Sequence, residues 1–337
     1  MKAIVVRTPA GLDNLEVENL PDPGQPGSGQ IRVALHATSL NFHDLLVANG
    51  TIPTENGRVL MSDGAGVVEA IGKEVTEFKV GDHVVSCFFP QWSDGLPFDA
   101  VANFHGTPGD GIDGYAAEYA VRSATAFTRA PRGWSHAEAA TITTAGLTAW
   151  RALVVNGQLK AGDSVLVLGT GGVSIAALQI AKSMGASVIA TTGSDDKFER
   201  LRDLGADHII NYRKTPDWGQ QVLELTSGQG VDHVVEVGGA GTLAQSIRAV
   251  KVGGHIALIG VLTGFNGEVP TMELMSKQVR LQGLIVGNRR QQQEYVAALE
   301  QTGIRPIIHD SLPLEQLADA FRRQERGEHF GKLVVEW

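Results

Sequence analysis

The chain has 337 residues, 43% of them hydrophobic, and its 28 Lys and Arg against 37 Asp and Glu give a net charge of −9. This length is long for one hydrophobic core, so two domains are expected. The acidic balance, without a long basic run, argues against nucleic acid or an anionic membrane surface as a partner. The single cysteine, Cys87, excludes a disulfide within the chain and fits a reducing, cytoplasmic location.

Residues 1–125 have the pattern of a mainly β domain. The first six residues are typical of a strand rather than a signal peptide, and no apolar run reaches the roughly 18 residues that a membrane-spanning helix needs. One short helical turn is expected near 41–49. The other strands expected here are 31–36, 66–71 and 83–87.

The stretch 161–192 predicts a strand, a Gly-rich turn, a helix and a second strand, which together form a βαβ unit. Gly169 permits the tight turn, and Gly171 lets the backbone approach a phosphate. Gly172 and Val173 follow at the helix N-terminus, where backbone N–H groups and the helix dipole favour negative charge. Ser174 stands at the position of the usual third glycine. The unit therefore predicts dinucleotide binding.

The alternation of strands and helices continues to about residue 287. A helical segment at 137–153 leads into the βαβ unit, and the later elements are strands at 208–210, 231–237, 255–259 and 281–286 and helices at 195–204, 218–225 and 243–250. Six strands with intervening helices predict a doubly wound parallel sheet. Ligands bind outside the carboxyl ends of such strands. The residues at these ends are therefore candidate cofactor contacts: Gly238, Gly260, Val261, Val286 and Gly287.

The last 50 residues are expected to return to the first domain. They contain a helical pattern at 289–302 and strand-like segments at 306–308 and 332–335.

Several motifs match a known superfamily over the whole chain. They are the segments 39–44, 63–68, 80–84, 114–119 and 204–207, the Gly-rich turn, and the segment 329–332. With these motifs the chain resembles the medium-chain dehydrogenase/reductase superfamily, in its zinc-independent branch of quinone oxidoreductases, enoyl reductases and alcohol-dehydrogenase-like relatives. The resemblance implies an α/β fold with a Rossmann domain at 126–287. It also implies a discontinuous β-rich, GroES-like catalytic domain at 1–125 and 288–337, and a homodimer.

The zinc ligands of the metal-containing relatives are absent. Asn41 occupies the position that resembles their ligating cysteine, and Ser62 and Asp63 replace their His-Glu pair. Cys87 alone cannot form their four-cysteine lobe. Because a catalytic zinc needs three protein ligands, we expect no metal.

Two residues near the first short helix are candidates for catalysis. Asn41 either caps the helix or, as the resemblance implies, hydrogen-bonds the cofactor ribose or a substrate oxygen. His43 is either a surface side chain or the donor of the proton that follows a hydride. Asp44 fits a helix-start carboxylate as well as a catalytic one.

The resemblance implies three further cofactor contacts. Thr144 lies before the helix that abuts the cofactor in the family and is expected to contact the nicotinamide or a phosphate. Phe330 and Lys332 belong to the terminal motif and are expected at the cofactor as well.

The end of the second Rossmann strand favours NADP(H) over NAD(H). NAD-specific domains place a carboxylate there for the ribose hydroxyls, whereas this strand ends without one before Asp195. Ser194 and Lys197 are suited to a 2′-phosphate, and Tyr212 with Arg213 resembles the pair that flanks it in NADPH-using relatives. Asp195 would disfavour a phosphate if it turned inward.

The chain is therefore predicted to be a zinc-independent NAD(P)H-dependent oxidoreductase that reduces a quinone or an α,β-unsaturated carbonyl compound. The alternatives are an NADP-dependent secondary-alcohol dehydrogenase and an NADPH-binding structural or RNA-binding relative. The substrate is expected to be a small carbonyl compound, quinone or alcohol. The loop 90–114 is a candidate for the substrate pocket, with Trp92, Phe98 and Phe104 as its walls.

Overall fold

The chain is described from residue 1 to residue 337, apart from the side chain of Ala100, in a computed structural model. Its contacts define two units: unit 1, Met1–Leu147 with Val286–Trp337, and unit 2, Thr148–Ile285. Strand β8 (Phe127–Arg129) pairs with β6 (His83–Ser86), which keeps the residues after 125 in unit 1. Unit 1 extends to Leu147, beyond the domain boundary expected after residue 125.

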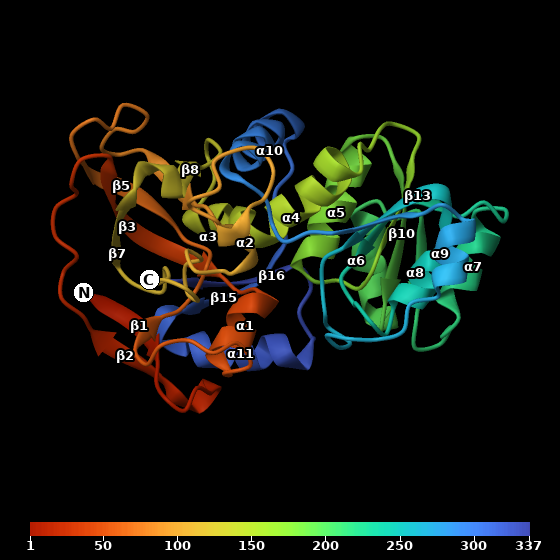
Figure 1. Ribbon diagram of the computed structural model, residues 1–337, viewed down its shortest axis with the longest axis horizontal. Coiled ribbons are helices and arrows are strands. Elements are labelled where there is room, and N and C mark those ends of the chain that lie inside the picture. The colour runs from red at the N-terminus through yellow and green to blue at the C-terminus, as the bar shows by residue number, and fades with distance from the viewer. The chain divides into compact units, whose positions relative to one another are not determined.

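Unit 1 is built on β-sheets (Figure 1). Its described residues form a seven-stranded sheet, in which β7 pairs with β3 beside the path β15-β16-β3-β5-β6-β8, and a three-stranded sheet in the order β2-β1-β4. Ile31, Val33 and Leu35 alternate along β3 and are buried in one core. The remaining strands are β1 (Lys2–Val6), β2 (Leu15–Asn19), β3 (Gln30–Ser39), β4 (Arg58–Val59), β5 (Ala65–Ile71), β7 (Tyr119–Ser123), β15 (Ile308–Pro313) and β16 (Lys332–Glu336).

The C-terminal segment returns to unit 1, as expected. β16 pairs antiparallel with β3, and β15 pairs parallel with β16. β15 begins at Ile308, where the strand expected at 306–308 ends. Helix α11 (Leu317–Arg326) was not among the expected elements, although its buried Leu317, Ala320 and Phe321 have helical spacing.

The other helices of unit 1 are short, with one exception. The predicted helix at 289–302 is confirmed as α10 (Arg289–Thr302), which Asn288 caps. A short helix, α2, lies within the expected loop 90–114. The remaining helical elements are α1 (Phe42–Ala48), α2 (Asp99–Ala102), α3 (His136–Ala140), the 3-10 turns η1 (Leu12–Asn14), η2 (Ala124–Ala126) and η6 (Leu314–Gln316), and the π-helical turn η3 (Ile142–Gly146).

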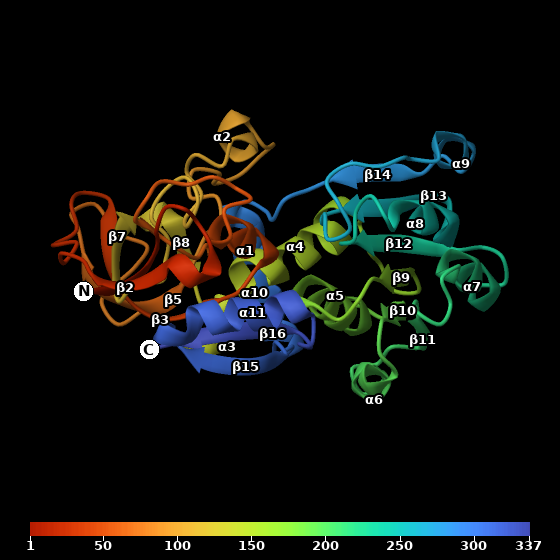
Figure 2. The ribbon, with the colours of Figure 1, turned by 90° about the horizontal axis from the view of Figure 1, so that it is seen from below.

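Unit 2 is a doubly wound sheet, which confirms the predicted fold class. Its six strands are all parallel and follow the order β11-β10-β9-β12-β13-β14, the order of a Rossmann domain (Figure 2). They are β9 (Ser164–Val167), β10 (Ser187–Thr192), β11 (His208–Asn211), β12 (Val231–Glu236), β13 (Val250–Leu258) and β14 (Arg280–Gly283).

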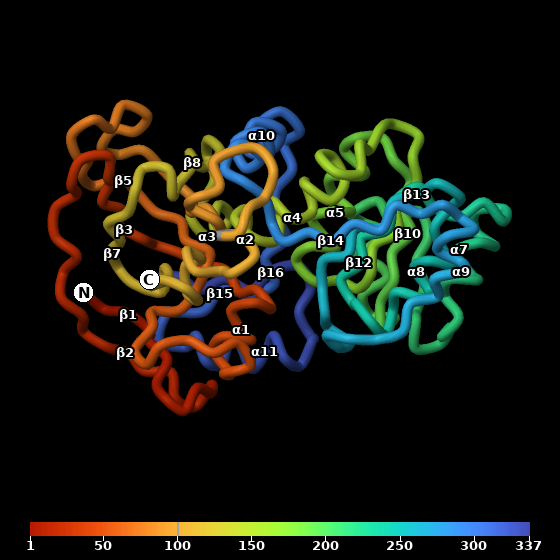
Figure 3. Tube along the Cα trace, viewed as in Figure 1, coloured from red at the N-terminus to blue at the C-terminus, as the bar shows by residue number. Residues whose placement is uncertain are grey.

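Helices cover this sheet through buried apolar side chains. Trp218 and Val222 of α7 and Ile247 of α8 are buried against the strands. The helical elements are α4 (Leu147–Trp150), the π-helical turn η4 (Arg151–Asn156), α5 (Gly172–Ser183), the 3-10 turn η5 (Asp195–Lys197), α6 (Phe198–Asp203), α7 (Trp218–Leu225), α8 (Leu243–Ala249) and α9 (Thr271–Ser276). No described helix is long and apolar enough to cross a membrane. The trace in Figure 3 can be followed from β14 into α10, where the chain re-enters unit 1.

Candidate functional site

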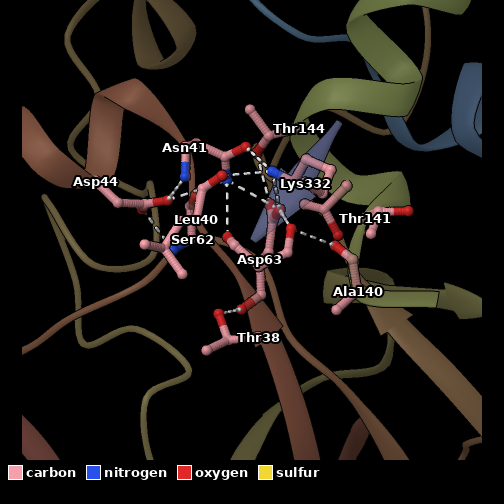
Figure 4. Close-up of polar contacts among 12 residues, drawn as sticks. Thr38, Leu40, Asn41, Asp44, Ser62, Asp63, Ala140, Thr141, Thr144 and Lys332 are labelled. Atoms are coloured by element: carbon pink, nitrogen blue, oxygen red, sulfur yellow. Dashed lines mark hydrogen bonds and ion pairs between the residues drawn. The ribbon is translucent and has the colours of Figure 1, made fainter. Parts of the chain in front are cut away.

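A buried polar cluster surrounds the start of α1 in unit 1 (Figure 4). Asn41 is the N-cap of this helix, one of the two roles that the sequence left open for it. Its backbone N–H donates to Asp44 Oδ2 at 3.2 Å, and its side-chain amide donates to Asp44 Oδ2 at 3.0 Å and to Asp63 Oδ2 at 2.9 Å. Asp44 also accepts from the backbone N–H of Ser62, which ties the helix to the segment before β5.

Asp63 lies at the centre of this cluster and is fully buried. Besides Asn41, the hydroxyls of Ser39 and Thr144 donate to its carboxylate, each at 2.6 Å. Thr144 belongs to the π-helical turn η3, a structure that often marks functional sites. Burial raises the pKa of Asp63 to about 6, and the nearby Lys332 ammonium limits that rise.

Lys332 supplies the positive charge of the cluster from β16. Its Nζ donates to the carbonyl of Leu40 at 2.5 Å and to Asn41 Oδ1 at 2.6 Å, and it lies 3.8 Å from Asp63 Oδ2. Burial lowers the pKa of Lys332. The sequence predicted that Lys332 and Phe330 contact the cofactor. In the structure the Lys332 ammonium binds groups of unit 1, and Phe330 is buried in the same unit.

His43 lies beside this cluster and contacts the loop 90–114. Its Nε2 is 3.3 Å from Asp110 Oδ2, and its ring stacks on Phe104 at 5.2 Å between centroids. Trp92 and Phe98 line a small hollow in the same loop, whereas Phe104 packs on His43. The aromatic side chains of this loop therefore lie in two places: Trp92 and Phe98 at the hollow, and Phe104 on His43.

In unit 2, the Gly-rich turn leaves its backbone open. Gly169 has a φ of +74°, and no atom lies within 4 Å of a Cβ built at Gly169 or at Gly171. α5 begins at Gly172, so the N–H groups of Gly172 and Val173 belong to its first turn. Ser174 Oγ donates to the carbonyl of Leu168 at 2.6 Å, which fixes the turn in place of a third glycine.

A basic group follows the second strand of this sheet. Lys197 Nζ donates to Thr170 Oγ1 at 3.1 Å, beside the Gly-rich turn. Burial, followed by the charges of Arg200 and Arg213, lowers the pKa of Lys197. A Cβ on Gly193 would lie 2.6 Å from the hydroxyl of Tyr212, so the end of β10 approaches that ring closely.

Asp195 turns away from this basic group. Its carboxylate accepts from Asn211 Nδ2 at 2.6 Å and from the Lys214 ammonium. Ser194 Oγ accepts from the backbone N–H of Asp196 and so caps η5. The carboxylate that could have disfavoured a phosphate therefore has other partners.

The loops after β12 and β13 lie against each other at the carboxyl edge of the sheet. A Cβ on Gly260 would lie 2.0 Å from the carbonyl of Val237, and one on Gly239 would lie 3.1 Å from the Cα of Val261. The carbonyl of Gly238 also accepts a hydrogen bond from the backbone N–H of Thr263 at 2.8 Å. The structure thus brings Gly238, Gly260 and Val261 together, as the sheet edge predicted.

Val286 and Gly287 do not end a strand. β14 stops at Gly283, earlier than the expected strand end at 286, and both residues belong to unit 1. Val286 has a φ of +47°. Gly287 precedes the N-cap of α10, where a Cβ would lie 2.7 Å from Gln291 Oε1. The apolar run 281–286 resembled a strand, but the chain leaves the sheet within it.

Sequence reasoning did not assign a role to three buried or nearly buried carboxylates. One feature of the sequence pointed to Asp63: it belongs to the Ser62-Asp63 pair that replaces a His-Glu pair. No motif near Asp110 indicated a role for it. Glu236 is fully buried, and its Oε1 accepts from the N–H groups of Gly238 at 2.8 Å and Gly239 at 2.9 Å.

The chain matches two family models. Residues 27–132 match the alcohol dehydrogenase GroES-like domain, and residues 172–301 match the zinc-binding dehydrogenase model. Within the described residues, apart from the side chain of Ala100, no group of three His, Cys, Asp or Glu is arranged to hold a metal ion.

Relatives match over nearly the whole chain. A zinc-type alcohol dehydrogenase-like protein of Schizosaccharomyces pombe is 39% identical over 336 residues, covering 97% of this chain and 96% of that protein. The structure of a candidate alcohol dehydrogenase from Sinorhizobium meliloti 1021 has a TM-score of 0.93 at 41% identity, covering 100% of this chain and 98% of the other. A mycobacterial structure complexed with NADPH, Rv1454c, has a TM-score of 0.83 at 28% identity and full coverage of both chains. The chain belongs to the medium-chain dehydrogenase/reductase superfamily of NAD(P)H-dependent oxidoreductases.

Proposed function

We propose that this chain uses NADPH to reduce a quinone or an α,β-unsaturated carbonyl compound without zinc. The observation that supports this most is the cluster of Asn41, Asp63 and Lys332, in which a buried ammonium lies beside a buried carboxylate. Reduction of a conjugated acceptor leaves a delocalised charge, which hydrogen-bond donors and a proton source can stabilise. A simple alkoxide is a more localised charge, for which a metal Lewis acid is the usual solution.

The donor set at this cluster does not fit a zinc ion. Both carboxylate oxygens of Asp63 already accept hydrogen bonds, from Ser39, Asn41 and Thr144. A dication there would also stand beside the ammonium of Lys332, 3.8 Å from Asp63. Zinc sites use Cys, His and carboxylate ligands, and an amide such as that of Asn41 is not among them.

Elemental analysis tests the metal-free assignment directly. The purified protein is expected to hold well under one zinc per chain, and its activity should survive treatment with a chelator. Stoichiometric zinc, lost together with activity on chelation, is the result that contradicts the assignment.

The residues of unit 2 fit an NADP(H) molecule. The Gly169–Val173 turn would take the pyrophosphate at the open N-terminus of α5. Lys197 would take the 2′-phosphate together with Ser194 and Tyr212. When bound, NADPH supplies the hydride, while this chain orients the acceptor and supplies the proton. In unit 1, we propose that Asn41 and Thr144 hold the reacting groups in place and that His43 gives the proton.

A substrate panel tests the proposed reaction. Loss of NADPH absorbance is measured with small enones, enoyl thioesters and quinones, and in the reverse direction with secondary alcohols and NADP⁺. Turnover of the conjugated acceptors, but not of the alcohols, is expected. The names of the yeast and bacterial relatives favour the alcohol dehydrogenase as second candidate, and turnover of alcohols alone would select it. Tight NADPH binding without any turnover would identify a binding protein.

We also propose that the chain forms a homodimer through the β14 edge of unit 2. β14 has one paired neighbour, and the segment around it exposes large apolar side chains: Leu262, Phe265, Val269, Met272, Met275 and Ile285. An exposed strand edge beside an apolar surface is a usual interface between identical chains.

Light scattering after gel filtration tests the dimer. The unmodified chain should have twice the mass of one protomer, and Met275→Glu, which charges a side chain that is 66% exposed, should shift it toward monomer. Leu96→Glu is the control, because Leu96 is 88% exposed in unit 1. A monomeric unmodified chain contradicts this proposal.

A further inference from the structure

The ring of His43 is fixed by its surroundings. It stacks on Phe104 and meets Phe88 edge-on, with centroids 5.2 Å and 5.3 Å away. Its Nε2 is buried, makes no hydrogen bond among the described residues, and lies 3.3 Å from Asp110 Oδ2. Only 16% of the His43 side chain and 11% of the Asp110 side chain are exposed. A fixed imidazole thus faces a carboxylate in a place with little water.

Asp110 is also held in position, although it lies on a long loop. Its carbonyl accepts from Thr54 Oγ1 at 2.9 Å, and its N–H donates to the carbonyl of Thr107 at 3.3 Å. The preceding Gly109 has a φ of +85°, and a Cβ there would lie 2.8 Å from the backbone of Met61. This close approach leaves the loop little freedom, so the carboxylate stays near the ring.

The charged groups on the neighbouring elements have other partners. Asp44 of α1 accepts from Ser62 and Asn41, Asp63 lies beside Lys332, and Asp113 of the same loop pairs with Arg58. His105 is the next titratable group on this loop, and its side chain is exposed. Asp110 is therefore the group whose charge acts most directly on His43.

We propose that Asp110 is a positioning residue for His43, whose ring it orients for the reduction proposed above, on which this inference rests. When bound, NADPH would supply a hydride to the acceptor, and the electron pair that this displaces would move to carbon or oxygen and take up a proton. The N–H bond at Nδ1 of His43 then breaks, and its proton bonds to that atom. The ring becomes neutral, keeps its Nε2 proton toward Asp110, and is reprotonated by water.

The test replaces Asp110 by asparagine, which keeps the size of the side chain and removes its charge. Nitrogen NMR gives the tautomer of the neutral His43 ring, and the spectrum of His43→Gln identifies its signal among the ten histidines. We expect the proton on Nε2, toward the carboxylate, in the unmodified chain, and a mixture of both tautomers in Asp110→Asn. Because a ring without this contact presents its proton less well, kcat should fall about tenfold in Asp110→Asn while KM changes little. Asp110→Glu should restore most of both effects.

Asp113→Asn is the matched control, since it makes the same charge change on the same loop and removes only the contacts with Arg58 and Val59. It should leave the tautomer of His43 and kcat unchanged. An unchanged tautomer in Asp110→Asn overturns the pairing, and so does an equal change in both variants, because it is then a general effect of loop charge. A neutral ring protonated on Nδ1 in the unmodified protein also contradicts the pairing. The NMR measurements need no turnover, so a chain that reduces no acceptor refutes the proposed function and leaves the pairing to the tautomer.

Discussion

Replacing Lys332 by methionine should lower the free energy of unfolding by about 3–5 kcal/mol, the usual cost of removing one partner of a buried ion pair. Methionine keeps the length of the side chain but carries no charge. It leaves Asp63 buried without a counter-charge, and it removes the donor from the Leu40 carbonyl and from Asn41 Oδ1. Urea unfolding of the purified variant measures the loss.

A double variant separates the charge effect from simple packing. Asp63→Asn removes the unpaired carboxylate, so the double variant with Lys332→Met should be more stable than Lys332→Met alone. Lys2→Met is the surface control, because Lys2 pairs with Glu315 while 41% of its side chain is exposed. Equal losses in the single and double variants would show that Lys332 and Asp63 are not coupled.

The loss in Lys332→Met should also depend on pH. Burial already raises the pKa of Asp63 to about 6 in the folded chain, and the missing ammonium would raise it further. A carboxyl whose folded pKa exceeds its unfolded value stabilises the fold at low pH, and this contribution is lost as pH rises through the folded pKa. Lys332→Met should therefore lose less stability at pH 5 than at pH 8.

Lys197→Ala should raise the dissociation constant for NADPH roughly tenfold to a hundredfold, the usual effect of losing one charged hydrogen bond. Lys197 lies beside Thr170, and burial, with the charges of Arg200 and Arg213, lowers its pKa. A 2′-phosphate would add a negative charge beside this ammonium, whereas NADH carries none at this position. Fluorescence titration should thus show little change for NADH.

Arg202→Ala is the matched control for this experiment. It removes the same charge from α6, the helix that follows Lys197, but Arg202 lies over the ring of Phe198. NADPH binding should therefore be nearly unchanged in this variant. Tighter binding of NADH than of NADPH by the unmodified chain would refute the coenzyme assignment.

The sequence alone was sufficient for features that depend on neighbouring residues. The βαβ unit is confirmed because a buried strand, a turn with Gly169 and Gly171, and a helix can be recognised within about 30 residues. Asn41 was also recognisable as a possible N-cap, since a cap depends on the next few residues. The parallel sheet followed from the repeated alternation of strands and helices, because such connections are right-handed and place successive strands in few possible orders.

Only the tertiary structure decided which polar groups meet. Lys332 and Asn41 are 291 positions apart, and they meet because β16 pairs with β3, whose end leads into α1. His43 and Asp110 meet because a loop without a local signal returns to the first turn of that helix. The direction of Asp195 was likewise undecided until Asn211 and Lys214 were seen to bind it. Such contacts depend on strand register and on where buried charges find partners, and both are properties of the packed chain rather than of any short segment.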